Sequence, residues 1–170
     1  TETWNGCEGL AVPVTLEIYT IPSAPTATNY VACEGGVIPD LTATGTSLLW
    51  YDDAALTSQV GTGASFATTQ TAAGVYTYFV TQDDGNCESN AQMVTLTIYA
   101  LPPPPSTGNE TACEGGVIPD LTATGTSLLW YDDAALTSQV GIGASFATAQ
   151  TVAGVYTYFV TQDDGNCESN

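Results

Sequence analysis

The chain lacks cationic side chains. Its 170 residues include no Lys, Arg or His, against 18 Asp and Glu, which gives a formal net charge of −18. An ordinary globular domain carries about 25% charged residues of both signs. Without cations the protein cannot neutralise phosphates, so nucleic acid is excluded as a direct partner and anionic lipid is disfavoured. Side-chain ion pairs are excluded too, which leaves apolar burial, backbone hydrogen bonds and disulfides to stabilise the fold.

The same absence excludes the common catalytic sites. A Ser-His or Cys-His nucleophile needs His, and a Schiff base needs Lys. A glycosidase needs two carboxyl groups that face each other. The pairs Asp52-Asp53 and Asp83-Asp84 are adjacent in sequence, and adjacent side chains of an extended chain point to opposite faces. The sequence therefore predicts a protein that is not an enzyme and holds no cofactor.

Long apolar runs are also missing. No run approaches the ~20 residues that span a bilayer, and no charged-then-apolar leader opens the sequence. We expect no direct membrane insertion, and any export signal to lie outside these residues. With 44% apolar residues the chain is too apolar for a disordered tail.

What the chain does contain is a tandem repeat with a period of 80 residues. Residues 32–90 match residues 112–170 with three differences, at Thr62/Ile142, Thr69/Ala149 and Ala72/Val152. Residues 1–20 align more loosely with residues 81–100. A period of this length indicates an array of similar units.

This alignment predicts three segments. Residues 1–20 would be the C-terminal hairpin of a preceding repeat, residues 21–100 a complete repeat, and residues 101–170 a repeat without its last strand. Pro-rich stretches at 21–29 and 101–109 would be linkers, and the four consecutive prolines of the second favour a stiff polyproline II spacer.

Within a unit the signals are all β. Short runs rich in Thr, Val and Tyr, separated by Gly, Asp-Asp and Pro, predict strands at 41–45, 47–51, 64–69, 74–82 and 91–100. Trp50 ends one apolar strand, and the run GVYTY at 74–78 follows it. This resembles the immunoglobulin pattern of a buried Trp and a tyrosine corner. Tyr78 stands where antibody domains have a cysteine, so their central disulfide is absent. The predicted fold is all-β: tandem immunoglobulin-like β-sandwich repeats with Pro-rich linkers.

Five cysteines remain to be paired, and two schemes fit their spacing. One pairs Cys33 with Cys87 and Cys113 with Cys167; the other pairs Cys7 with Cys33 and Cys87 with Cys113. Because Cys87 would open the last strand, ~40 Å of chain would separate it from the next unit, whereas a disulfide joins Cα atoms within ~7 Å. We therefore predict the pairing within each unit, with Cys7 left over. Disulfides imply an oxidising, extracellular location.

The hairpin tip that occurs once in each repeat is the only metal candidate. Its carboxylate and amide oxygens suit calcium, although no known calcium-loop spacing is present. A solvated turn is the favoured interpretation. The candidate residues are Asp83, Asp84, Asn86 and Glu88, and their counterparts Asp163, Asp164, Asn166 and Glu168.

Strand alternation also predicts an apolar patch on the outer face of the sheet. Ordinary cross-strand pairing explains such a patch; a contact surface for carbohydrate or another filament is the sharper alternative. The residues are Leu49, Tyr51 and Phe79, and their counterparts Leu129, Tyr131 and Phe159.

The motifs CEGG, LTATG, WYDD, GASFAT, VYTYFVTQ and GNCES together resemble Ig-like modules repeated in giant secreted proteins of gliding Bacteroidota-type bacteria. This resemblance implies a bacterial cell-surface adhesin exported by type IX secretion, used in attachment or gliding motility. Its partners would be neighbouring repeats of the same chain, surface polysaccharide or other filaments. Two alternatives remain open: a self-assembling surface filament completed by strand addition, and a carbohydrate-binding accessory module of a secreted polysaccharide hydrolase.

Overall fold

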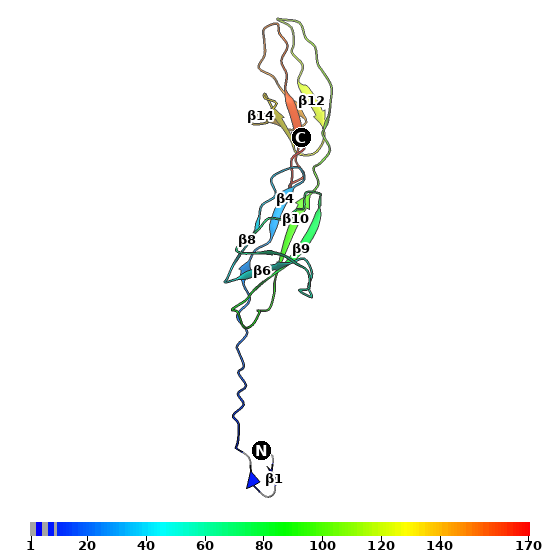
Figure 1. Ribbon diagram of the computed structural model, residues 1–170. Coiled ribbons are helices and arrows are strands. Elements are labelled where there is room, and N and C mark those ends of the chain that lie inside the picture. Colours follow the sequence, from blue (N-terminus) through cyan, green and yellow to red (C-terminus); the bar gives the residue numbers. More distant parts are fainter. Residues whose placement is uncertain (1–2, 5–6, 9) are drawn as a thin grey trace.

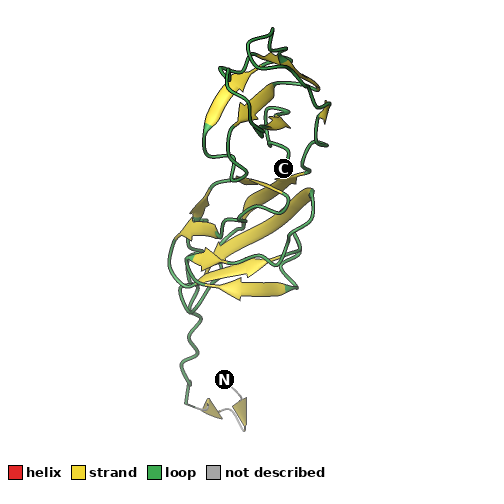
Figure 2. Cartoon of the chain, turned by 90° about the horizontal axis from the view of Figure 1, so that it is seen from above, coloured by secondary structure: helices red, strands yellow, loops and turns green. Residues whose placement is uncertain are grey.

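Two β-sandwich units lie end to end beyond an extended N-terminal stretch (Figure 1). The computed structural model describes residues 3–4, 7–8 and 10–170, with side chains from residue 10 onwards. The described part contains strands and loops and no helix, which confirms the all-β prediction (Figure 2). Accordingly, no helix of the described residues has the length and apolar character needed to cross a bilayer.

The first unit is a sandwich of two sheets. The smaller sheet has the strand order β3-β5-β8, and the larger one the order β4-β10-β9-β6-β7. Strands β10 and β9 pair antiparallel along most of their length, while β4 pairs parallel with β10. The bounds are Thr26–Ala27 for β3, Tyr30–Cys33 for β4, Leu41–Thr44 for β5, Leu48–Tyr51 for β6, Gln59–Thr62 for β7, Ser65–Phe66 for β8, Gly74–Gln82 for β9 and Gln92–Tyr99 for β10.

The core of this unit lies between the two sheets. Strand alternation sends every second residue inward, and β10 contributes the fully buried Val94, Leu96 and Ile98. Trp50 is completely buried and donates a hydrogen bond from Nε1 to the Gly63 carbonyl at 2.9 Å. Its ring stacks on Phe66, with centroids 5.6 Å apart. Aromatic packing thus fills the space between the sheets.

The predicted tyrosine corner is confirmed. Tyr76, near the start of β9, donates its hydroxyl proton to the Ala72 carbonyl at 2.9 Å. Tyr78, two residues on, is buried and meets Phe66 edge to face at 5.3 Å. An aromatic contact therefore occupies the place where antibody domains have a disulfide.

The second unit repeats part of this plan. Strands β11, β12 and β15 form one sheet, and β14, β13 and β16 form the other. Two strands of the first unit have no counterpart in the second: its described residues contain no equivalent of β4 or β10. The bounds are Ser106–Thr107 for β11, Leu121–Thr124 for β12, Leu128–Tyr131 for β13, Gln139–Ile142 for β14, Ser145–Phe146 for β15 and Phe159–Gln162 for β16.

The predicted linkers at 21–29 and 101–109 are too long. In each, a short strand takes the place of the last part: β3 pairs with β5, and β11 pairs with β12. The residues after the last proline, Thr26-Ala27 and Ser106-Thr107, can donate backbone hydrogen bonds to a neighbouring strand, which proline cannot do. The spacer that remains between the units is the proline run at 102–105.

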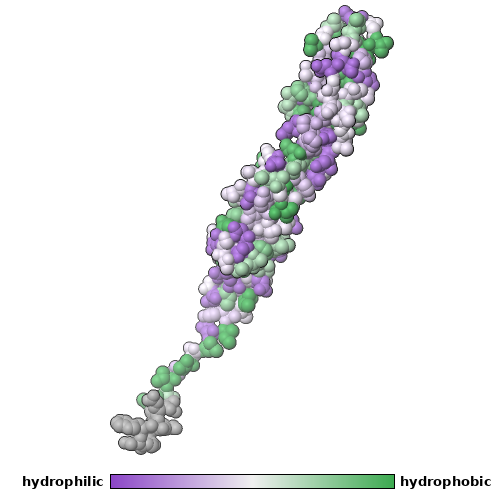
Figure 3. All heavy atoms as spheres, turned by 90° about the vertical axis from the view of Figure 1, so that its right-hand side faces the viewer, coloured by the Kyte–Doolittle hydropathy of each residue, from purple (hydrophilic) through white to green (hydrophobic). Residues whose placement is uncertain are grey.

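Before the first unit, β1 (Thr3–Trp4) pairs antiparallel with β2 (Cys7–Glu8). The hairpin predicted for residues 1–20 lies partly outside the described residues. Residues 10–20 are described, and none of them belongs to a strand. Figure 3 shows hydrophobic side chains along this extended stretch.

Candidate functional site

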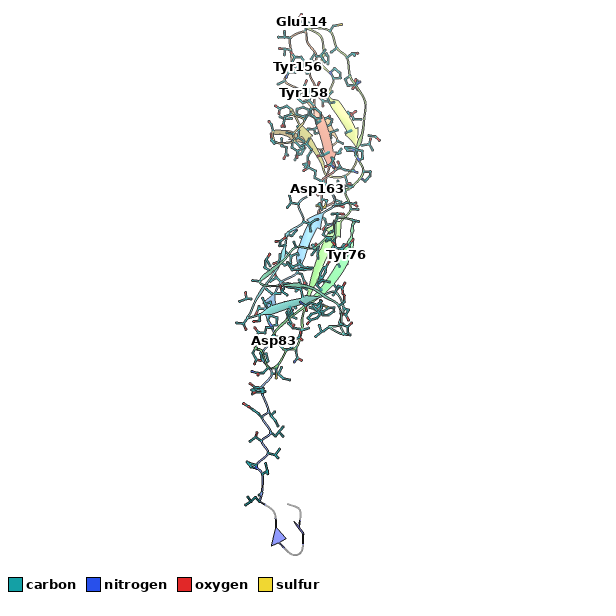
Figure 4. The ribbon with its side chains drawn as sticks, in the orientation of Figure 1. Tyr76, Asp83, Glu114, Tyr156, Tyr158 and Asp163 are labelled. Atoms are coloured by element: carbon teal, nitrogen blue, oxygen red, sulfur yellow. A yellow bond between two sulfur atoms is a disulfide. The ribbon has the colours of Figure 1, made fainter. Side chains whose placement is uncertain are left out.

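The junction between the two units is closed by a disulfide. Cys33, the last residue of β4, is bonded to Cys167, which lies in the turn after β16. Their Cα atoms are 5.9 Å apart, and 134 positions separate them in sequence. Figure 4 shows Asp163, in the same turn as Cys167, at the meeting point of the units. The bond therefore locks the base of the second unit onto the end of the first.

The predicted pairs Cys33–Cys87 and Cys113–Cys167 are wrong. Tyr99, the last residue of β10, pairs with Cys33, so Cys33 lies at the end of the unit where the chain leaves it. Cys87 precedes β10 and lies at the opposite end. The eight residues of β10 span about 27 Å, far beyond the reach of a disulfide. The parallel pairing of β4 with β10, which was not predicted, places Cys33 out of reach of Cys87.

Two cysteines of the described part have no disulfide partner. Cys113, the counterpart of Cys33, is exposed, and Cys87, the counterpart of Cys167, is half-buried. The side chain of Cys7, which was predicted to be left over, lies outside the described residues.

A glutamine fixes the linker to the unit that follows it. Gln162 Nε2 donates to the Pro103 carbonyl, and Gln162 Oε1 accepts a hydrogen bond from the Thr126 amide at 3.0 Å. Gln82 repeats this in the first unit, with donation to the Ser23 carbonyl at 2.6 Å. Sequence reasoning missed both glutamines, although each closes the strand TYFVTQ in its own repeat.

A side chain on the glycine of the facing turn would displace this glutamine. A Cβ at Gly125 would lie 2.5 Å from Gln162 Oε1, and one at Gly45 would lie 2.6 Å from Gln82 Oε1. The same close contact between glycine and glutamine thus occurs beside the linker in both units.

The hairpin tip proposed for calcium is organised by its own hydrogen bonds. Asp83 Oδ1 accepts from the Gly85 amide at 2.7 Å, and Asp84 Oδ1 accepts from the amides of Cys87 and Asn86. These bonds, with that of Cys87 first, hold the pKa of Asp84 below its ordinary value. The same cause lowers the pKa of Asp164 in the second unit.

Glu88 is hydrogen-bonded to two side chains of the strands. Its Oε1 accepts hydrogen bonds from Tyr51 at 2.9 Å and from Thr81, and Glu168 is held alike by Tyr131 and Thr161. The described residues contain no group of three or more acidic, Cys or His side chains that could hold a metal ion. Calcium binding stays a prediction. In the structure these carboxylates accept hydrogen bonds that hold the turn and its neighbouring strands together.

The predicted outer patch is partly wrong. Leu49 and Phe79 lie on the outer face and are half-buried, but Tyr51 and its counterpart Tyr131 are buried. The acidic tip folds back over this face, and Glu88 covers the Tyr51 hydroxyl. Burial, followed by the contact with Glu88, raises the pKa of Tyr51. Leu129 and Phe159 of the second unit are likewise half-buried. Two of the six residues predicted for the patch are thus buried and four are half-buried.

A groove of about 1050 Å³ opens in the second unit, where the first unit has β10. Tyr156 and Tyr158 lie beside it in the upper unit of Figure 4, on the segment that corresponds to β9. The lining also includes Ile118, Leu121, Trp130 and Val160. Their counterparts in the first unit belong to the core or pack against it. By sequence alignment, a strand equivalent to β10 would follow Asn170, and the groove lies at the place of that strand.

The comparisons with known proteins concern the first unit. No curated protein matches the chain. The disulfide fits a protein outside the cytoplasm. Residues 22–99 match the family model of the Ig-like domain, CHU_C associated. Together with the fold, this match points to an extracellular module of a structural or adhesion type.

Proposed function

We propose that the chain is a stalk segment of a large extracellular repeat adhesin, which serves surface attachment or gliding motility and carries no catalytic centre. The observation that supports this most directly is the junction: two sandwich units of nearly identical sequence stand end to end, joined by the Cys33–Cys167 bond (Figure 1). A unit that is bonded to its neighbour extends reach without flexing at the linker.

Charge supports the same role. A net charge of −18 without a single cation makes neighbouring stalks repel each other, so many copies can stand side by side without clumping. The absence of Lys and Arg also removes every cleavage site for trypsin-like proteases. Both properties suit a protein that stands outside a cell.

The family and the resemblance support the location. The CHU_C-associated Ig-like match covers residues 22–99, and the repeated motifs resemble modules of type IX secretion cargo in gliding bacteria. The outer face, with Tyr51 buried under Glu88, favours a spacer over a carbohydrate-binding module. Adhesion would then reside in other parts of the parent protein.

Antibodies raised against residues 21–170 test this role on living cells of the source organism. We expect them to label thin surface fibres and to reduce attachment or gliding. A monovalent fragment serves as the control for cross-linking of cells by the antibody. Labelling that appears only after cell lysis would overturn the proposal.

A further inference from the structure

Apart from the disulfide, neither strand pairing nor a hydrogen bond joins the two units. Every sheet of the described residues lies within a single unit or in the β1–β2 hairpin. No hydrogen bond runs between residues 22–99 and residues 106–170, all of which the structure describes. Cys33 Sγ does come within 3.4 Å of the Asn166 carbonyl, but a disulfide sulfur has no proton to donate. The linker and the disulfide are therefore the connections that restrain how the units are placed.

The linker is fixed to a unit at each of its ends. The Tyr99 carbonyl accepts a hydrogen bond at 2.8 Å from the Glu34 amide, which belongs to the first unit. The Pro103 carbonyl accepts a hydrogen bond from Gln162 of the second unit. Residues 100–102 lie between these two anchors. While both anchors hold, any change in the angle between the units has to arise within these residues.

The residues between the anchors differ in backbone freedom. The ring of Pro102 fixes its φ angle, and a residue before proline is restricted to extended conformations, which limits Leu101. Ala100 has neither restriction, is exposed, and makes no backbone hydrogen bond to another described residue. Rotation at Ala100, and to a smaller extent at Leu101, would swing one unit against the other.

The disulfide adds a second connection beside this hinge. Cys33 is paired with Tyr99 in the register of β4 and β10, so the bond begins next to the first anchor. Cys167 lies in the turn that follows Gln162, so the bond ends on the same base of the second unit as the second anchor. Two bodies with one flexible joint can turn in every direction, whereas a second covalent link leaves only rotation about the line between the links.

We propose that the Cys33–Cys167 bond is a redox lock on a hinge at Ala100–Leu101. With the bond formed, the two units move as one rod. After its reduction, they swing independently about the hinge. This inference goes beyond the adhesin role, because it concerns only the motion of two linked units and can be tested without any measurement of adhesion.

Unlocking is thiol–disulfide exchange with an external thiol. Cys167 is 3% exposed and Cys33 is half-buried, so the thiolate of the reductant attacks the Cys33 sulfur. The S–S bond breaks, its electron pair stays on the Cys167 sulfur, and Cys33 carries a mixed disulfide. A second thiolate attacks the reductant's sulfur in that mixed disulfide and releases Cys33. The two cysteines take up the protons of the two thiols, which leave as one small disulfide.

Residual dipolar couplings of the whole chain test the lock. In a background of Cys7→Ser, Cys87→Ser and Cys113→Ser, Cys33 and Cys167 are the cysteines that remain. With the bond formed, one alignment tensor should fit the couplings of both units. After reduction, each unit should need its own tensor, while amide chemical shifts away from the junction stay unchanged and show that both units remain folded. Reoxidation should restore the shared tensor.

The same couplings can refute the lock in two ways. One tensor that still fits both units of the reduced chain would show that another contact holds them. Two tensors in the oxidised chain would show that the bond does not make the junction rigid. Cys33→Ser in the same background provides a second route to the unlocked state and should behave as the reduced chain does.

A stiffened linker locates the hinge. Ala100→Pro combined with Leu101→Pro extends the proline run to the end of β10 and favours polyproline II, which is a semi-rigid spacer. This variant should keep one shared tensor even after reduction. Ala100→Gly combined with Leu101→Ala is the matched control and should need two tensors, as the reduced parent does. Two tensors in the reduced proline variant would overturn the placement of the hinge.

Trapping the mixed disulfide tests the attacked sulfur. Brief treatment with a small monothiol, an acid quench and pepsin digestion preserve the intermediate for mass spectrometry. The adduct should be found on Cys33, with Cys167 free. An adduct mainly on Cys167 would contradict the proposed attack and show that the junction opens before the bond is reduced.

Discussion

The two units have almost the same sequence and different structures. The segment GVYTYFVTQ is a nine-residue strand as β9 in the first unit, whereas in the second only its last four residues form a strand, β16. Val80 is fully buried, and its counterpart Val160 is half-buried. The difference lies in the neighbour: β10 pairs with β9 residue by residue, and nothing in the described residues pairs with 154–158. Strand formation here depends on the partner more than on intrinsic preference.

The largest change should follow from giving the second unit its missing neighbour. A copy of residues 91–100 added after Asn170 should convert 154–158 into strand. Burial of three aliphatic side chains should stabilise the unit by about 5 kcal/mol. Hydrogen exchange of the amides at 154–158 measures the strand, and urea unfolding measures the stability. The same extension with its Val, Leu and Ile replaced by Asp is the control; equal protection in both chains would contradict the prediction.

The next effect concerns the bond that the units share. Cys33→Ser removes a disulfide that closes a span of 134 positions. In the chain-entropy model such a closure contributes about 5 kcal/mol to the free energy of unfolding. Measured contributions of disulfides are often smaller than this model value. Cys87→Ser removes a thiol without a bond and should leave unfolding unchanged. Mass spectrometry of pepsin fragments under non-reducing conditions provides the direct check, because a fragment that links Cys33 to Cys87 would refute the junction.

The same Leu→Ala substitution at matching positions should destabilise the first unit more than the second. Leu41 is completely buried, while Leu121, in the same local sequence, is only half-buried beside the groove. Leu41→Ala should lower the free energy of unfolding of its unit by about 3 kcal/mol, and Leu121→Ala by about 1 kcal/mol. The Trp fluorescence of each unit, with Trp4 and the Trp of the other unit replaced by Phe, reports the two transitions separately. Equal losses would mean that the groove is closed in solution.

The smallest difference should be found far from the groove. Burial, followed by the contact with Glu88 or Glu168, raises the pKa of both Tyr51 and Tyr131. A tyrosine whose folded pKa is raised stabilises the fold below its unfolded pKa near 10, and this contribution is lost as the pH rises through the higher folded value. Tyrosinate absorbance, measured as the pH is raised, reports the ionisation of these tyrosines. Tyr51→Phe and Tyr131→Phe should each remove the same share of the absorbance change at high pH. Unequal parts would show that the missing strand disturbs the whole second unit.

The sequence predicts most of the fold because local patterns encode it. The alternation in residues 91–100 and the run GVYTYFVTQ locate β10 and β9 with little error. Trp50 and Tyr76 indicate the sandwich because each makes a hydrogen bond to a residue nearby in the sequence, and both features are common to the immunoglobulin fold. The missing strand of the second unit follows from the alignment alone.

The junction could not be predicted in the same way. Cys33 was placed by its spacing from other cysteines, but its position depends on β4 pairing parallel with β10, a contact between residues far apart in sequence. Tyr51 was assigned to the correct face, yet Glu88 reaches over it from a turn that strand alternation does not describe. In both cases a tertiary contact decides what the local pattern leaves open.

The Cys33–Cys167 bond also determines how the rod carries tension. A pull on the two ends passes from Cys33 to Cys167 through sulfur, so the chain between them is bypassed. Those 134 positions would otherwise release about 450 Å of extended polypeptide. Residues 34–166 therefore carry no tension, and this part of the chain keeps its length until a reductant cuts the bond.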